Sequence, residues 1–162
     1  MEKIICVDMD SVLADFEASE VLDPGLPIRP QVHKMYEHGF FFKLKPVSGA
    51  MSGLRALVRL GYDVHILSKP VAESAHSYSE KVQWIGMWFP EFIGKLHLTQ
   101  EKGLFRGDYL IDDDANKWKD KWEANGGKFI HFQYRRDGDN AAEWQRIIDY
   151  FRSEKDGSAD SN

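Results

Sequence analysis

Short, continuous apolar runs recur along the chain, and segments whose apolar residues follow helical spacing separate them. Such runs, rich in branched side chains, are typical of strands buried on both faces of a parallel sheet. The runs cover residues 4–7, 64–67, 96–98, 109–111 and 128–132. The pattern therefore predicts five strands.

Helices are predicted between and after these strands. The helical pattern covers residues 48–60, 77–89, 115–125 and 140–151. The second of these segments spaces its apolar residues one helical turn apart, at Val82, Ile85, Trp88 and Phe89. Gly61 is a natural stop for the first helix, because glycine accepts the left-handed backbone that often ends a helix. Strands alternating with helices predict an α/β fold, a Rossmann-like, mostly parallel sheet with helices on both faces.

Residues 16–45 break this alternation, because they contain three prolines and the cluster Phe-Phe-Phe at 40–42 but no strand pattern. We expect helices near 12–20 and 31–38. Open α/β sheets bind ligands at the carboxyl ends of their strands, where an insertion after the first strand would lie. The segment is thus predicted to be a small, mainly helical cap over a binding site.

The length of 162 residues fits a single domain. We expect that domain to span residues 1–152, with a core at about 1–15 and 46–152 and the cap at about 16–45. Residues 153–162 are polar, with one small apolar side chain. We expect them to form a disordered tail.

Composition narrows the possible partners and the compartment. The chain has 21 Lys and Arg against 26 Asp and Glu, a formal charge of −5, which does not favour binding to polymeric nucleic acid. No apolar stretch approaches the ~20 residues of a membrane helix. The start of the chain lacks the features of a signal peptide, and Cys6 is the single cysteine, so a reducing cytoplasm is the expected location. The six histidines show no metal-ligand spacing, and no zinc site is predicted.

Acidic residues follow two of the predicted strands. Asp8 and Asp10 come directly after the first strand, and residues two apart in extended backbone point the same way. Asp112, Asp113 and Asp114 follow the strand at 109–111. Carboxylates crowded at one mouth repel each other, and a hard divalent cation with oxygen ligands is the usual compensation. The alternatives are an exposed turn for the first pair and a helix N-cap for the second group.

Polar residues that suit a phosphate group also follow the second and third predicted strands. Ser68 and Lys69 follow the second strand, where a hydroxyl and free backbone N–H groups suit a phosphate oxygen. Lys102 lies between the third and fourth strands and could balance the charge of a phosphoryl group. The alternatives are a helix cap for Ser68 and a solvated side chain for Lys102.

The order Asp-x-Asp, Ser, Lys, Asp-Asp resembles the haloacid dehalogenase superfamily of aspartate-nucleophile phosphatases. Residues 8–16 read Asp-Met-Asp-Ser-Val-Leu-Ala-Asp-Phe. They resemble the first motif of the cytosolic type C 5′(3′)-deoxyribonucleotidase family, which typically reads Asp-Met-Asp-Gly-Val-Leu-Ala-Asp-Phe. Residues 40–50, 98–102 and 107–113 resemble further segments of that family, and the resemblance covers roughly residues 3–132.

The chain departs from the family pattern at four positions. Ser11 replaces the usual glycine, Ser68 the more common threonine, and Gln100 and Asp114 stand where members often carry arginine. No clear match exists for the aromatic pair that helps such enzymes to hold the base. The preferred base is therefore left open.

The resemblance implies a role for each site residue. Asp8 would be the nucleophile and Asp10 the general acid and base. Mg²⁺ would be held by an Asp8 oxygen, the Asp10 backbone carbonyl and Asp113, with Asp112 holding a metal-bound water or bonding to Lys102. The four aspartates would form the catalytic and metal centre.

The remaining implied roles concern the substrate. Ser68, Lys102 and the backbone N–H of Lys69 would bind phosphoryl oxygens. Phe16 and Phe42 would close an apolar slot over sugar or base, with packing between cap and core as the alternative reading.

The expected activity is Mg²⁺-dependent removal of phosphate from nucleoside monophosphates, with deoxyribonucleotides favoured, through an aspartyl-phosphate. The alternatives are the same chemistry on another small ester, such as a sugar phosphate, and a non-catalytic nucleotide-binding relative. A signalling receiver domain fits poorly, because its acceptor aspartate ends a later strand, whereas the second strand here ends in Ser68. The expected partner is a small nucleotide, and the oligomeric state stays open, a homodimer included.

Overall fold

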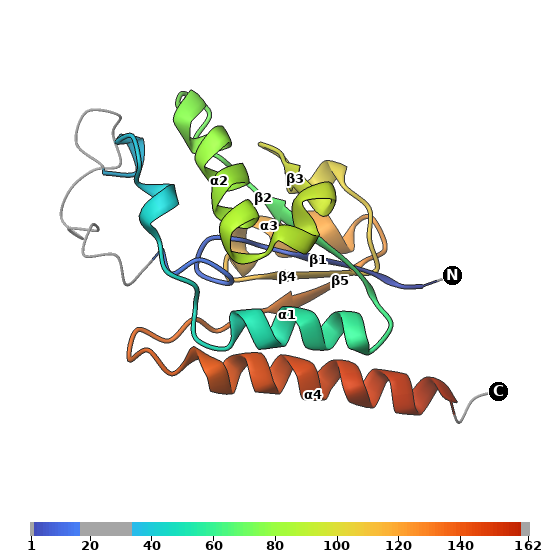
Figure 1. The fold of residues 1–162 in the computed structure, drawn as a ribbon. Coiled ribbons are helices and arrows are strands. Elements are labelled where there is room, and N and C mark those ends of the chain that lie inside the picture. The colour runs from blue at the N-terminus through green and yellow to red at the C-terminus, as the bar shows by residue number, and fades with distance from the viewer. Residues whose placement is uncertain (1, 17–33, 160–162) are drawn as a thin grey trace.

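A single parallel sheet forms the centre of the computed structural model, which describes residues 2–16 and 34–159 (Figure 1). Its strands lie in the order β3-β2-β1-β4-β5. They are β1 (Ile4–Val7), β2 (Asp63–Ser68), β3 (Leu96–Leu98), β4 (Tyr109–Asp112) and β5 (Lys128–His131). The five predicted strands and the predicted α/β class are confirmed.

Four α-helices and four short 3₁₀ helices connect the strands in the described part of the chain. The α-helices are α1 (Ala50–Arg59), α2 (Ala75–Trp88), α3 (Ala115–Glu123) and α4 (Asn140–Ala159). The 3₁₀ helices are η1 (Lys34–Tyr36), η2 (Phe41–Lys43), η3 (Pro90–Lys95) and η4 (Lys102–Leu104). The predicted stop of the first helix is also confirmed, because Gly61 adopts a φ of 81° just after α1.

The alternation of side chains along each strand divides the core into two layers. Ile5 and Val7 of β1 point into the larger cluster, whereas Cys6 points into the smaller one. Helices α1, α2 and α4 contribute their apolar side chains to the larger cluster, and α3 contributes Trp118 and Trp122 to the smaller. Helices therefore cover both faces of the sheet, and Figure 1 shows α1 and α4 side by side on one of them.

The buried face of α2 agrees with the predicted one at Ile85 and Phe89, which are fully buried, and differs from it at Val82. Val82 is 42% exposed, while Trp84 and Ile85 are fully buried. Two charged residues, Glu80 and Lys81, share the buried face. Apolar spacing missed these two residues because it does not detect polar side chains on the inner surface of a helix.

The predicted helix near 12–20 is wrong for its described part. Residues 11–13 form a turn, in which Leu13 N and Ala14 N both donate to Met9 O at 2.8 Å. Ala14 then pairs with Pro46 in an isolated bridge, which holds this loop extended against the chain that enters α1. Residues 17–20 lie outside the described residues.

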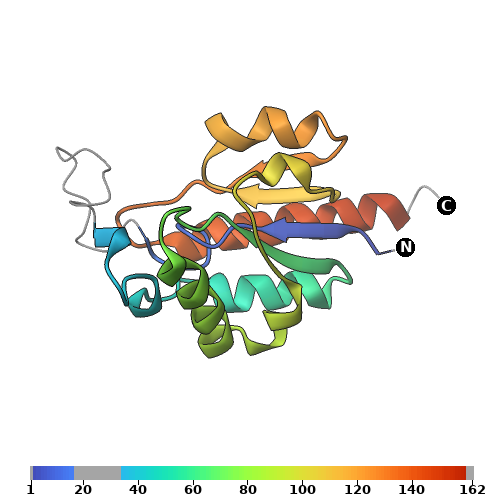
Figure 2. The same ribbon diagram turned by 90° about the horizontal axis from the view of Figure 1, so that it is seen from above.

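Of the cap predicted at 16–45, the structure describes residue 16 and residues 34–45. Of the predicted helix at 31–38, residues 34–36 form η1, and 31–33 lie outside the described residues. The segment 34–44 carries η1 and η2 and packs against α2. Figures 1 and 2 place it at the end of the molecule opposite the N-terminus, where the strands have their carboxyl ends.

The predicted disordered tail is wrong over residues 153–159, which continue α4. Two side chains of that last stretch contact core tyrosines. Glu154 accepts a hydrogen bond from Tyr109 Oη at 3.0 Å, and Lys155 Nζ lies 4.7 Å from the centre of the Tyr62 ring. These contacts explain why a polar sequence remains helical. Residues 160–162 lie outside the described residues.

None of the described helices is long and apolar enough to cross a bilayer.

A close contact between α1 and α4 gives a test of this packing. A Cβ atom on Gly53 would lie 2.3 Å from Trp144 Cε3 and 2.6 Å from its Cδ2, and Trp144 is only 1% exposed. Alanine normally favours a helix by about 1 kcal/mol over glycine. Here we expect Gly53→Ala instead to lower the free energy of unfolding by about 1–3 kcal/mol, because the indole cannot move away.

Gly157→Ala is the matched control, because nothing lies within 4 Å of a Cβ at that position of α4. It should leave stability unchanged or raise it by up to about 1 kcal/mol. Urea unfolding of both variants measures the difference. Equal stability of Gly53→Ala and the parent would contradict the packing described here.

Candidate functional site

Neighbouring strands bring the predicted acidic residues together. Strands β1 and β4 pair in parallel, with Val7 opposite Ile111, and Asp8 N continues the ladder by donating to Ile111 O at 2.9 Å. Asp8 is 7% exposed and Asp112 1% exposed. One carboxylate oxygen from each of Asp8, Asp112 and Asp113 lies within 4.8 Å of the others. The sheet order thus brings Asp8, Asp112 and Asp113 together at the carboxyl ends of the strands, where they form an acidic mouth.

A buried lysine lies between two of these acids. Lys102, at the start of η4, is 2% exposed, and its Nζ donates to Asp8 Oδ1 at 2.5 Å and to Asp112 Oδ2 at 2.6 Å. Burial alone would lower the pKa of Lys102, but the charges of the two aspartates and their hydrogen bonds raise it above its ordinary value. The lysine therefore stays charged and holds the two carboxylates together.

The single positive charge of Lys102 does not balance the three carboxylates of Asp8, Asp112 and Asp113. Burial, and then the charge of Asp8, raises the pKa of Asp112 to about 7. Burial, followed by the charges of Asp8 and Asp112, raises the pKa of Asp113 to about 8. All three candidate ligands offer oxygen, which hard cations such as Mg²⁺ prefer. The residues present therefore fit a divalent cation, whose charge would hold these carboxylates in their ionised form.

A second buried lysine holds Asp10. Lys81 of α2 is fully buried, and its Nζ donates to Asp10 Oδ2 at 2.5 Å and to Ser68 Oγ at 3.1 Å. Burial raises the pKa of Asp10, against the charge of Lys81, which lowers it. The other oxygen, Asp10 Oδ1, is buried without a hydrogen-bond partner among the described residues. A carboxyl group in this state can hold a proton and present it to a bound molecule.

Lys81 is the site residue that the sequence analysis missed. The sequence did carry a signal for it. Lys81 lies three residues before Trp84 and four before Ile85, so it shares a helix face with these two buried side chains. A lysine in register with buried apolar residues must find an acidic or polar partner. The sequence analysis did not assign Lys81 to the buried face of the helix, so that partner was not sought.

The remaining predicted polar residues lie around the same mouth. Ser68 is fully buried at the end of β2, and the exposed Lys69 lines the cavity above the acids. Ser11 adopts a φ of 60°, a left-handed backbone that explains why glycine is usual there. Gln100 donates to Pro70 O at 3.0 Å and to Tyr78 Oη at 2.8 Å, so its amide braces the loop after β2.

Asp114 has the capping role that was the alternative for this acidic group. Its side chain accepts a hydrogen bond from Lys117 N at 3.2 Å, at the start of α3. Its own backbone N–H donates to Asp112 Oδ1 at 2.9 Å. The cap therefore also fixes the orientation of the carboxylate that Lys102 holds.

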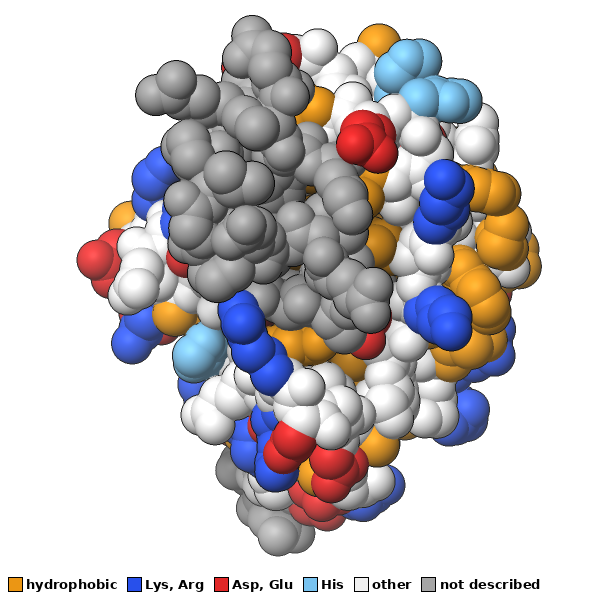
Figure 3. All heavy atoms as spheres, turned by 90° about the vertical axis from the view of Figure 1, so that its left-hand side faces the viewer, with side chains coloured by type: hydrophobic (Ala, Val, Ile, Leu, Met, Phe, Trp, Pro, Cys, Tyr) orange, Lys and Arg blue, Asp and Glu red, His pale blue; other side chains and the backbone are white. Residues whose placement is uncertain are grey.

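Two adjoining cavities lie at the carboxyl ends of the strands. Figure 3 looks onto this end of the molecule, the left-hand side of Figure 1. The first has a volume of about 350 Å³, and its lining includes Asp8, Asp113 and Phe16. The second, of about 270 Å³, is lined in part by the rings of Tyr36 and Phe41. Both cavities include Asp10 and Lys69. A molecule with a phosphate in the first cavity would have aromatic surface beside it.

The two predicted aromatic contacts differ in position. Phe16 lines the first cavity, and its ring packs against Phe40 and Phe41, with centroids 5.5 Å and 6.2 Å away. Phe42 is 38% exposed and lines neither of these two cavities. The structure therefore brings Phe16 to the site, whereas it does not bring Phe42 there.

Comparison with solved structures shows a chain of similar fold. The chain superposes on the crystal structure of a candidate haloacid dehalogenase-like hydrolase from Burkholderia xenovorans LB400. The TM-score is 0.50, with 16% sequence identity, and the match covers 81% of each chain. The chain therefore shares the fold of this protein.

Sequence comparison identifies the family. Residues 27–154 match the family model described as "5′ nucleotidase, deoxy (Pyrimidine), cytosolic type C protein". The human cytosolic-type 5′(3′)-deoxyribonucleotidase is 32% identical over 139 residues, which cover 67% of this chain and 69% of the human protein. A candidate 5′(3′)-deoxyribonucleotidase of Vibrio phage KVP40 is 29% identical over 158 residues, covering 93% of this chain and 85% of the relative. The chain belongs to the cytosolic type C 5′-nucleotidase family, a family of phosphoric monoester hydrolases.

Proposed function

We propose that the protein removes phosphate from nucleoside monophosphates, with deoxyribonucleotides preferred, in a Mg²⁺-dependent reaction through an aspartyl-phosphate. The observation that carries this proposal is the buried set of Asp8, Lys102 and Asp112, with Asp10 held separately by Lys81. Two acids with different partners suit two different chemical roles. Family membership supports a nucleotide as the substrate.

In the proposed first step, a carboxylate oxygen of Asp8 attacks the phosphorus atom and the bond from phosphorus to the ester oxygen breaks. Asp10 gives its proton to that leaving oxygen. In the second step, Asp10 takes a proton from water, whose oxygen attacks the phosphorus of the aspartyl-phosphate. This releases inorganic phosphate and restores the Asp8 carboxylate.

The surrounding residues keep these groups in place. Lys102 fixes the Asp8 carboxylate, and Lys81 fixes that of Asp10, so each acid faces the first cavity in one orientation. The hydroxyl of Ser68, the backbone N–H of Lys69 and the ammonium of Lys102 are the proposed donors to phosphoryl oxygens.

Mg²⁺ would be held by Asp8, Asp113 and the backbone carbonyl of Asp10, while Asp112 bonds to Lys102. When bound, it would supply positive charge that offsets the negative charge of the transferring phosphoryl group. Phe16 in the first cavity, and Tyr36 and Phe41 in the second, are the proposed contacts for sugar and base.

The direct test is phosphate release from a panel of 5′- and 3′-nucleotides, in ribose and deoxyribose forms, and of sugar phosphates. Each would be assayed with Mg²⁺ and with a chelator. We expect deoxynucleotide turnover that the chelator abolishes. Asp8→Asn should lower kcat by about 10⁴-fold or more, because it removes the nucleophile.

Asp120→Asn, an exposed change on α3, is the matched control and should retain full activity. Turnover of sugar phosphates alone would refute the proposed substrate while keeping the hydrolase. Undiminished activity in Asp8→Asn would refute the proposed nucleophile. Binding of nucleotide without any turnover would identify a non-catalytic relative.

Lys81→Met tests the role of the lysine that sequence analysis missed. Methionine fills a similar volume without charge, so the Asp10 carboxyl loses the group that orients it. We expect kcat to fall by at least about 100-fold, the usual contribution of a positioned general acid, with a smaller change in KM.

Lys95→Met removes a lysine that pairs with Asp63 at the surface, at the start of β2, and should leave kcat unchanged. Circular dichroism of both variants checks that they are folded. A folded Lys81→Met protein with the parent's kcat would show that Lys81 has no part in positioning Asp10.

A further inference from the structure

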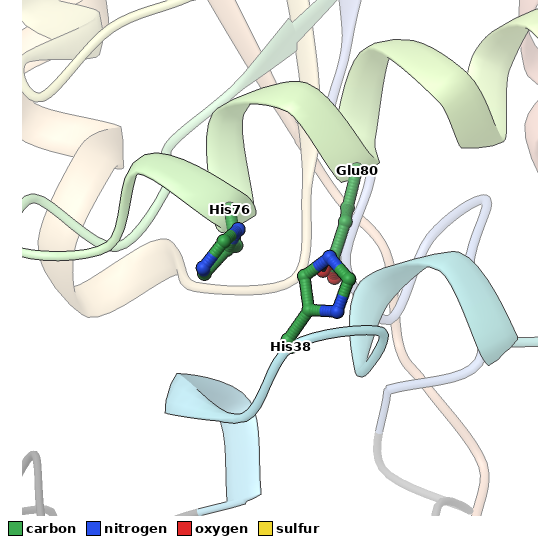
Figure 4. Close-up of side chains that lie close together, drawn as sticks. All are labelled: His38, His76 and Glu80. Carbon is green, nitrogen blue, oxygen red and sulfur yellow. Dashed lines mark ion pairs between the residues drawn. The ribbon is translucent and has the colours of Figure 1, made fainter.

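A cluster of two histidines and a glutamate lies outside the acidic mouth. His76 and Glu80 are one turn apart on α2 and therefore share a face of the helix, and His38 approaches them from the segment 34–44 (Figure 4). The imidazole rings of His38 and His76 have centroids 4.4 Å apart. His38 Nε2 lies 3.9 Å from Glu80 Oε1. One possible ligand atom from each residue lies within 4.8 Å of the other two.

The glutamate is fixed, whereas the histidines are accessible. The Glu80 side chain is 3% exposed, and it accepts hydrogen bonds from Gly39 N at 2.5 Å and Phe41 N at 3.1 Å. A carboxylate has about four acceptor positions, so these two bonds leave capacity for a further partner. The His38 side chain is 76% exposed, and His76 is also exposed. A metal ion could reach the cluster directly from solvent.

We propose that His38, His76 and Glu80 form a Zn²⁺ site, separate from the oxygen-lined mouth at Asp8. Two imidazole nitrogens and one carboxylate oxygen are a ligand set that zinc accepts, with a fourth position left for water. Mg²⁺ prefers oxygen ligands, so the two clusters differ in the ion that they select. Ligand atoms around tetrahedral zinc are about 3.4 Å apart, so the exposed His38 ring has to turn inwards by a small amount.

Zinc at this cluster would join the segment 34–44 to α2. Glu80 already holds the backbone of that segment, and the next residue, Lys81, reaches Asp10. Tyr36 and Phe41, in the same segment, line the second cavity. Bound zinc would therefore stabilise the wall of that cavity. Sequence spacing did not indicate this site, because His38 comes from a different element from His76 and Glu80.

The test is zinc binding to the untagged full chain in an excess of Mg²⁺, measured by isothermal titration calorimetry and by thermal unfolding. The Mg²⁺ occupies oxygen-rich sites. At free zinc about 100-fold above Kd, we expect the midpoint of unfolding to rise by about 5–10 °C. His76→Gln and His38→Gln should each weaken zinc binding by more than about tenfold, because even a supporting contact to a ligand is worth that much.

His97→Gln is the matched control. His97 Nε2 lies 2.9 Å from His65 Nδ1, a second histidine pair, on β2 and β3, and this variant should keep the zinc affinity of the parent. Loss of binding in His97→Gln but not in His76→Gln would assign the zinc to that pair and overturn the proposal. Equal zinc binding by the parent, His38→Gln and His76→Gln, or none by the parent, would also overturn it. None of these measurements depends on phosphatase activity, so the proposed function can fail without affecting this result.

Discussion

The site depends on one interaction, the buried bridge of Lys102 between Asp8 and Asp112. Parallel pairing of β1 and β4 forces these carboxylates to the same edge of the sheet, where burial makes their mutual repulsion costly. Lys102 offsets that repulsion and fixes both side chains. The raised pKa of Asp113, about 8, marks the charge that remains to be balanced. A divalent cation with oxygen ligands would balance this local excess of negative charge.

Helix α2 connects this chemistry to the segment that lies beyond the strand ends. Successive residues of its buried face have different targets, since Glu80 binds the backbone at Gly39 and Phe41 whereas Lys81 binds Asp10 and Ser68. The segment 34–44 and the proposed general acid are therefore positioned by the same rigid turn of helix. Any change that moves this turn should affect the substrate cavity and the acid together.

The sequence predicted the strands and the acidic centre because both follow local rules. Continuous apolar runs mark buried parallel strands, and Asp8, Ser68 and Asp112 each lie at the end of one. Lys81 and the grouping of His38 with His76 could not be predicted in this way, because each depends on how α2 packs against distant segments. The helical end of α4 was missed for the same reason, since its polar side chains contact tyrosines far away in the sequence.

The most direct test of the account is to trap the covalent intermediate on Asp8. The protein would be mixed with Mg²⁺ and a deoxynucleotide that it turns over, quenched in acid and reduced with borohydride, which converts an aspartyl-phosphate into homoserine. Mass spectrometry of the peptide that contains residues 8–10 would then locate the change. We predict homoserine at Asp8, formed only when substrate is present. Reduction at another aspartate, or steady turnover without any reduced residue, would contradict the assignment of Asp8 as the nucleophile.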